Sequence, residues 1–148
     1  KTFYHYYETL DDLLSEMQVE ISREFLTRIK GYHLPEDLDK VNREFFRYSA
    51  AKGEAYEKIT LNAGWRGVRN EMMGKVNDAG WRDSVSYQKL SDFEKVLLMD
   101  FINKSTLAAY RHWVEDGKKL AIDEVVDVLN RLQIGGVKNF FEEADSSR

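Results

Sequence analysis

Apolar side chains recur along this chain at the spacing of an α-helix, and this periodicity constrains the fold more than any other feature. A period of about 3.6 residues places every third or fourth side chain on one helix face, whereas side chains in strands alternate from one residue to the next. Strand-like alternation is weak throughout the 148 residues, which contain one proline and no serine- or glycine-rich linker. We therefore predict one all-α unit without an internal domain boundary.

Local signals define the first predicted helices. Thr9 suits an N-cap because Asp12 follows three positions later, and it opens a predicted helix over residues 10–29. Gly31 follows as a stop signal. Further helices are predicted over residues 36–51, 54–61 and 65–76, with residues 77–80 closing the last of them.

The last two predicted helices carry more apolar surface than one helix face can hold. Ser91 and Glu94 form a capping box that opens a helix over residues 92–115, and a final helix is predicted over residues 122–133, ended by two glycines. An antiparallel pair from each of two copies would form a four-helix dimer interface. The alternative is that both helices are buried within their own domain. The residues predicted at the dimer interface are Leu107, Tyr110, Trp113, Val114, Val125, Leu129 and Leu132.

Charge and composition exclude several classes of function. The net charge is −4, from 22 basic and 26 acidic side chains that alternate along the chain, so this sequence is expected to bind DNA poorly by itself. There is no cysteine, and therefore no disulfide and no thiolate site. Nothing resembles a signal peptide or an apolar run of the ~20 residues that span a bilayer, so we expect a cytoplasmic protein without a membrane role.

No residue pattern predicts an enzyme. The three histidines, His5, His33 and His112, lie in three separate segments, and none belongs to the Glu-x-x-His motif of a di-iron helical bundle. The acidic series Glu16, Glu20 and Glu24 is typical of a solvated helix face, and no phosphate-binding glycine loop is present. We predict no catalytic site, no metal and no cofactor.

Four stretches of the chain match the pattern of a known family. Residues 109–117 and 122–126 place a tryptophan near the end of a long helix, then a glycine turn and a helix with an acidic start, and residues 42–48 match an earlier helix. At the N-terminus an aromatic-rich helix end runs through a cap into a new amphipathic helix; the matching residues are Thr2, Phe3, Tyr4, Tyr6, Tyr7, Thr9, Leu13 and Leu14. In this order and spacing the chain resembles TetR-family transcriptional regulators.

The resemblance implies two parts. Residues 1–8 would be the remnant of a helix-turn-helix recognition helix, and residues 9–148 the regulatory domain that binds a ligand and dimerises. Thr2, Tyr4 and Tyr6 would contact DNA, since hydroxyl groups donate to phosphate oxygens. An operator would be bound through the missing N-terminal part of the helix-turn-helix, so this chain alone is not expected to act as a repressor.

The resemblance also implies a pocket for a small apolar effector inside the regulatory domain. The residues predicted to line it are Met17, Ile21, Phe25, Phe45, Tyr56, Trp65, Met72 and Met73; Trp65 and Trp81 are expected at its mouth. The alternative function is a helical protein-interaction module without an effector. An internal cavity would favour the first function, and a filled core with an exposed apolar patch would favour the second.

Overall fold

The structure is a computed structural model that describes residues 9–61 and 66–146. In these two segments the chain forms helices and no strands, which confirms the prediction of an all-α fold. The helices are α1 (Leu10–Ile29), α2 (Leu38–Lys52), α3 (Glu54–Leu61), α4 (Arg66–Trp81), α5 (Val85–Gln88), α6 (Asp92–Glu115) and α7 (Ile122–Ser146). None of these described helices combines the length and the apolar character that a membrane crossing requires.

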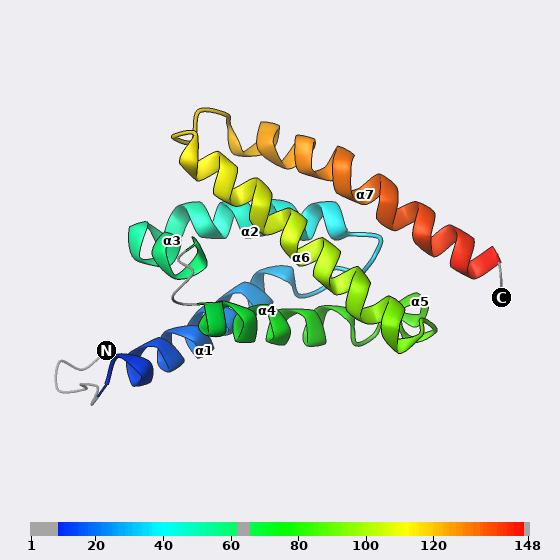
Figure 1. The fold of residues 1–148 in the computed structure, drawn as a ribbon, viewed down its shortest axis with the longest axis horizontal. Coiled ribbons are helices and arrows are strands. Elements are labelled where there is room, and N and C mark those ends of the chain that lie inside the picture. The colour runs from blue at the N-terminus through cyan, green and yellow to red at the C-terminus, as the bar shows by residue number, and fades with distance from the viewer. Residues whose placement is uncertain (1–8, 62–65, 147–148) are drawn as a thin grey trace.

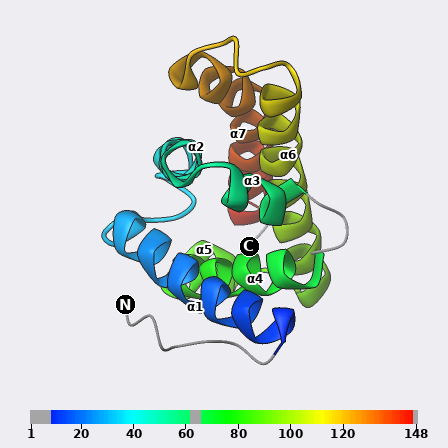
Figure 2. The ribbon, with the colours of Figure 1, turned by 90° about the vertical axis from the view of Figure 1, so that its left-hand side faces the viewer.

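The helices form three levels, with α2 and α3 in the middle (Figure 1). Helices α1 and α4 lie side by side below α2, and α7 lies above it. Helix α6 crosses from the level of α4 to that of α7 and forms an antiparallel hairpin with α7 (Figure 1). Figure 2 shows α2 end-on between the α1–α4 pair and this hairpin.

Local capping signals begin two of the long helices where the sequence predicts. Thr9 Oγ1 accepts a hydrogen bond of 3.1 Å from the backbone N–H of Asp12, and α1 covers the predicted residues. At the start of α6, Ser91 Oγ accepts from the Glu94 N–H while Glu94 accepts from the Ser91 N–H, which completes the capping box. These contacts satisfy backbone donors that the first helical turn leaves unpaired.

Helix α4 is longer than predicted. We expected residues 77–80 to end it, but α4 continues to Trp81. Trp81 is buried and packs against Leu34 and Leu90, and Gly80 brings α4 close to Leu34. The burial of an indole outweighs the low helix propensity of asparagine, aspartate and glycine, so the prediction of a turn here is wrong.

The end of α7 was also predicted wrongly. Gly135 and Gly136 lie inside the helix, which runs to Ser146. Each glycine costs roughly 1 kcal/mol relative to alanine in a helix interior. Beyond them, Val137 and Phe141 are both buried, and burial of such side chains contributes roughly 1.5–3 kcal/mol each. Tertiary burial therefore carries the helix through the two glycines.

Candidate ligand pocket and polar core

A pocket of about 110 Å³ lies where α1, α2, α4 and α6 meet. Helix α1 contributes Ile21, Ser22, Phe25 and Ile29, which face the other three helices. The rest of the lining is mostly aliphatic and aromatic, with amide and hydroxyl groups among it. Within the described parts of the chain, no charged side chain lines this pocket. The site therefore has the chemistry of an apolar binding pocket with a few polar groups.

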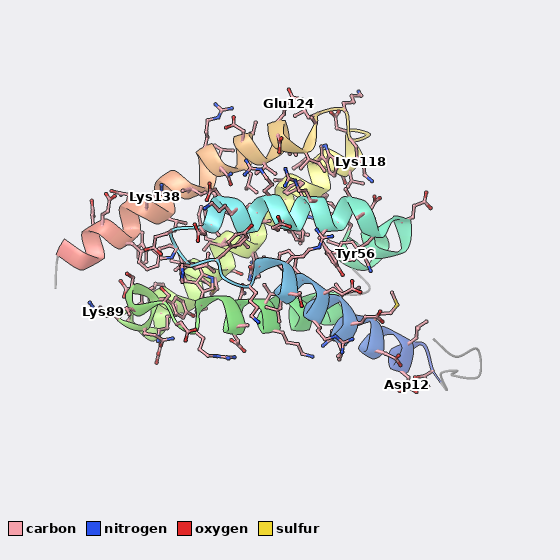
Figure 3. The ribbon with its side chains drawn as sticks, turned by 180° about the vertical axis from the view of Figure 1, so that it is seen from behind. Asp12, Tyr56, Lys89, Lys118, Glu124 and Lys138 are labelled. Atoms are coloured by element: carbon pink, nitrogen blue, oxygen red, sulfur yellow. The ribbon has the colours of Figure 1, made fainter. Side chains whose placement is uncertain are left out.

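The structure brings most of the predicted pocket residues together. Ile21, Phe25, Phe45, Tyr56 and Met73 all line the pocket. Tyr56, labelled in Figure 3, reaches from α3 and packs against the α1 side chains of the same apolar cluster.

The other predicted pocket residues divide into two groups. Met17 packs against the same apolar cluster as Tyr56 but is not part of the pocket lining. Trp65 and the side chain of Met72 lie outside what the structure describes. Trp81, expected at the mouth, lines the pocket, and it stacks on Phe141 with 6.1 Å between ring centroids.

Sequence reasoning missed the polar side chains of the site. Ser22 lies on the same face of α1 as Ile21 and Phe25, and Asn42 lies on the face of α2 that buries Leu38 and Phe46. The sequence signal that could have identified these residues is a polar side chain at helical spacing within an apolar helix face. Such a residue is buried with the face that carries it, and it then requires a hydrogen-bond partner.

Asn42 meets this requirement through a buried network with α6 and α7. Its Nδ2 donates to Gln133 Oε1 at 2.8 Å and to Asn130 Oδ1 at 3.0 Å, while its Oδ1 accepts from Thr106 Oγ1 at 3.2 Å. Gln133 Nε2 donates to Thr106 Oγ1 at 3.0 Å and to Ser105 Oγ at 2.7 Å. Because Asn42 and Thr106 also line the pocket, this network connects the pocket to α7.

Ser22 differs from Asn42. Its side chain is buried, and its hydroxyl makes no hydrogen bond to any residue that the structure describes. The pocket lies beside it. A buried hydroxyl without a partner costs free energy in the folded protein, so a group that enters the pocket could relieve this cost.

A polar contact at the solvent edge holds α1 to α2. Tyr48 Oη donates to Glu24 Oε1 at 2.6 Å, and Lys52 Nζ donates to the same oxygen at 3.0 Å. The hydrogen bond from Tyr48, followed by that from Lys52, lowers the pKa of Glu24 below its usual value. Burial raises the pKa of Tyr48, and its bond to the Glu24 carboxylate raises it further. At neutral pH, Glu24 is therefore a charged carboxylate and Tyr48 a neutral phenol, which are the states that this hydrogen bond requires.

Most of the residues predicted at a dimer interface belong instead to the core of the single chain. Tyr110, Trp113, Val125 and Leu129 are buried together with Phe46 of α2. Because α2 packs against this face of the hairpin, these four side chains are covered within the chain. The prediction that they lie at a dimer interface is therefore wrong.

The three remaining predicted interface residues have different surroundings. Leu107 lines the pocket, Val114 packs against the core cluster of Phe46, and Leu132 is 77% exposed.

Other apolar side chains of the hairpin stay exposed. On α6 the exposed apolar side chains are Phe93, Val96, Leu97 and Phe101, and on α7 they are Val128 and Leu132. Ser105 follows Phe101 by one helical turn and contacts Gln133, which directly follows Leu132. Phe101 and Leu132 therefore lie near the line along which α6 meets α7. We call the six exposed residues the hairpin face.

Thr2, Tyr4 and Tyr6, the proposed DNA contacts, and His5 lie outside the described residues. His33 and His112 are exposed, and His112 Nδ1 lies 3.9 Å from Glu115 Oε1. In the part of the chain that the structure describes, no group of three histidine, aspartate or glutamate side chains could hold a metal ion.

Comparisons with protein families, with curated proteins and with solved structures find no match for this chain. The resemblance to TetR-family regulators therefore stays a prediction from the sequence.

Proposed function

We propose that this chain is the ligand-responsive dimerisation domain of a TetR-like transcriptional regulator. The observation that carries the proposal is the pocket between α1, α2, α4 and α6, whose described lining is mostly apolar and carries no charged side chain. A pocket of this kind suits a small apolar effector. The DNA-reading function would belong to the helix-turn-helix that the N-terminal residues resemble.

Helix α1 is the proposed route from the ligand to DNA. It contributes Ile21, Ser22, Phe25 and Ile29 to the pocket, and its N-terminal end follows the segment that resembles a recognition helix. A ligand that pushes on these side chains would tilt α1 and change the spacing of the two DNA-reading heads in a dimer. A coupling free energy of ~1–3 kcal/mol is enough to switch DNA occupancy. The contact of Glu24 with Tyr48 and Lys52 would have to shift during such a tilt.

The hairpin face is the proposed dimer surface. Apolar side chains that remain 44–77% exposed on two adjacent helices, such as Phe93, Leu97, Phe101 and Leu132, suit an interface with a partner. Two hairpins packed face to face would form a four-helix interface. This proposal replaces the interface predicted from the sequence, because it uses the exposed apolar residues of α6 and α7 and leaves Tyr110 and Trp113 in the core.

Sedimentation of the purified protein tests the dimer. We expect a dimer for the native chain and a monomer for the double variant Leu97→Glu/Leu132→Glu, because two carboxylates per copy would be buried in the interface. Val19→Glu is the matched control, since Val19 is an exposed apolar residue on α1, away from the hairpin. A monomeric native chain at concentrations of about 100 µM would contradict the dimer, since a stable interface has a far lower dissociation constant.

DNA binding by the full-length protein tests the regulatory mechanism. A compound that binds the pocket should change the affinity for an operator, measured by fluorescence anisotropy, by about five- to 150-fold. If compounds that stabilise the protein leave DNA affinity unchanged, the allosteric mechanism fails.

A second candidate function is a helical protein-interaction module, and the hairpin face is the observation that favours it. The same exposed residues could bind a different protein. A monomer in sedimentation, together with no thermal stabilisation by any apolar compound, would select this function over the first.

A further inference from the structure

Among the described residues that line the pocket, Ser22 is the one whose buried polar atom has no hydrogen-bond partner. Its side chain is 4% exposed, it lines the pocket, and its Oγ has no hydrogen-bond partner among the described residues. The other polar groups that connect the pocket to α7, Asn42 and Thr106, already bond to one another. A ligand therefore gains most by bonding to Ser22, where it satisfies a group that is otherwise unpaired.

The charge of the lining limits the charge of the ligand. No lysine, arginine, histidine, aspartate or glutamate among the described residues lines the pocket. An ion that moves from water into such surroundings loses its hydration and finds no opposite charge. A neutral molecule loses much less.

The volume limits the size of the ligand. The pocket measures about 110 Å³. An apolar cavity of about 150 Å³ binds benzene, so this pocket accepts a ring of that size after a small movement of its side chains. Met73 is suited to such a movement because methionine side chains are flexible.

We propose that the pocket binds a small, neutral molecule with an apolar body and one hydrogen-bonding group, such as a hydroxyl or carbonyl, that pairs with Ser22 Oγ. This inference rests on the proposed ligand-binding function and adds the class of ligand and the residue that recognises it. The apolar body would pack against Phe25, Phe45 and Trp81, which line the same pocket.

Three probes of similar size test the inference: phenol, benzene and benzoate. Their dissociation constants are measured by ligand-observed NMR titration of the purified chain. We expect phenol to bind about three- to tenfold more tightly than benzene, because one net hydrogen bond is worth that much. Benzoate should bind at least tenfold more weakly than phenol, because its carboxylate has no basic partner in the lining.

The variant Ser22→Ala locates the hydrogen bond. It should weaken phenol binding to the level of benzene and leave benzene binding unchanged. It should also fold, since the hydroxyl it removes has no partner. Thr27→Ala is the matched control: it removes a hydroxyl from the exposed side of the same helix, and both affinities should stay unchanged.

The outcomes separate this inference from the proposed function. If phenol and benzene bind equally well, or if Ser22→Ala leaves the preference for phenol intact, the role of Ser22 is overturned while ligand binding stands. Benzoate binding as tight as phenol binding overturns the requirement for a neutral ligand. If none of the three probes binds at millimolar concentration, the ligand-binding function fails together with the inference.

Discussion

The α1–α4 side of the molecule and the α2–α6–α7 side are both built from apolar helix faces, and each buries one hydroxyl without a hydrogen-bond partner among the described residues, Ser22 on α1 and Tyr110 on α6. The two sides differ in that Ser22 lines the pocket whereas Tyr110 does not, and in the hydrogen-bond network of the second side. On the second side, Asn42, Thr106 and Gln133 hydrogen-bond to one another across three helices. On the first side, the Ser22 hydroxyl has no partner among the described residues and faces a pocket. A saturated network rigidifies the elements it joins, whereas an unpaired group beside free volume is suited to a ligand. The difference divides the chain into a scaffold and a binding region.

The largest expected effect lies in the aromatic core of the scaffold. Phe46 is fully buried and contacts Tyr110 and Trp113 with 5.8 and 5.7 Å between ring centroids. We expect Phe46→Ala to lower the free energy of unfolding by ~3–5 kcal/mol, measured by urea denaturation. Phe25→Ala should cost less, because Phe25 already borders the pocket and loses fewer contacts. Equal losses in the two variants would argue against the division into scaffold and binding region.

The network itself should give the next largest effect. Gln133→Leu leaves the Asn42 amide and the Thr106 hydroxyl with fewer partners, and we expect a loss of ~1–3 kcal/mol in the free energy of unfolding. The double variant Asn42→Leu/Gln133→Leu should recover part of this loss, since it removes both sides of the contact.

By contrast, Ser22→Ala should leave the free energy of unfolding nearly unchanged or raise it. A large loss in Ser22→Ala would show that its hydroxyl has an essential partner in the folded protein.

Two glycines of α4 offer a smaller, matched comparison. Gly74 is exposed, and a Cβ added there would meet nothing within 4 Å, so Gly74→Ala should stabilise the protein by ~0.5–1 kcal/mol. A Cβ on Gly80 would lie 3.2 Å from Leu34 Cδ1, beside the pocket. Gly80→Ala should therefore gain less stability and reduce phenol affinity, whereas Gly74→Ala leaves that affinity unchanged. Thermal denaturation and NMR titration measure the two effects.

The smallest effect is expected at the contact between α1 and α2. The pKa of Glu24 in the folded protein is lowered from 4.5, chiefly by the hydrogen bond from Tyr48. A lowered pKa means that this contact stabilises the folded state above the unfolded pKa, and that the stabilisation is lost as the pH falls through the folded pKa. The destabilisation by Tyr48→Phe, measured by urea unfolding, should therefore be larger at about pH 7 than at about pH 3.

Tyr56→Phe is the control for this pH dependence. Tyr56 accepts its hydrogen bond from Ser49, which is neutral at both pH values, so its effect on stability should not change with pH in the acid range. A pH-independent effect of Tyr48→Phe would show that Glu24 contributes nothing through its charge.

Local capping signals in the sequence predict the starts of α1 and α6, although the cap that Ser84 provides to α5 was missed. Thr9 and Ser91 each accept a hydrogen bond from the backbone N–H of the residue three positions later, so the helix start can be recognised from neighbouring residues in the sequence. The turn predicted over residues 77–80 and the helix end predicted at Gly135 and Gly136 are both wrong. In each case a large buried side chain beyond the glycine, Trp81 or Phe141, favours continuation of the helix. A sequence does not display which distant residues will cover such a side chain.

In the candidate site too, features that depend on one helix were predictable, and features that depend on distant residues were not. The apolar residues of the pocket on α1 and α2, such as Ile21, Phe25 and Phe45, were predictable because they share helix faces. The polar residues Ser22 and Asn42 were not, because their importance depends on what lies opposite them. The same is true of Tyr110 and Trp113: their apolar character was evident, but only the packing of α2 decides that they lie in the core and not at a dimer surface.

The sequence by itself therefore determined the all-α class, the starts of the capped helices and the apolar faces, since these depend on contacts within a few turns of one helix. The tertiary structure alone decided where α4 and α7 end, which apolar face stays exposed on the hairpin, and which buried polar groups find partners. The reason is physical. Burial and hydrogen bonding between helices depend on residues as far apart as Asn42 and Gln133, and their free energies exceed the local preferences that a sequence displays.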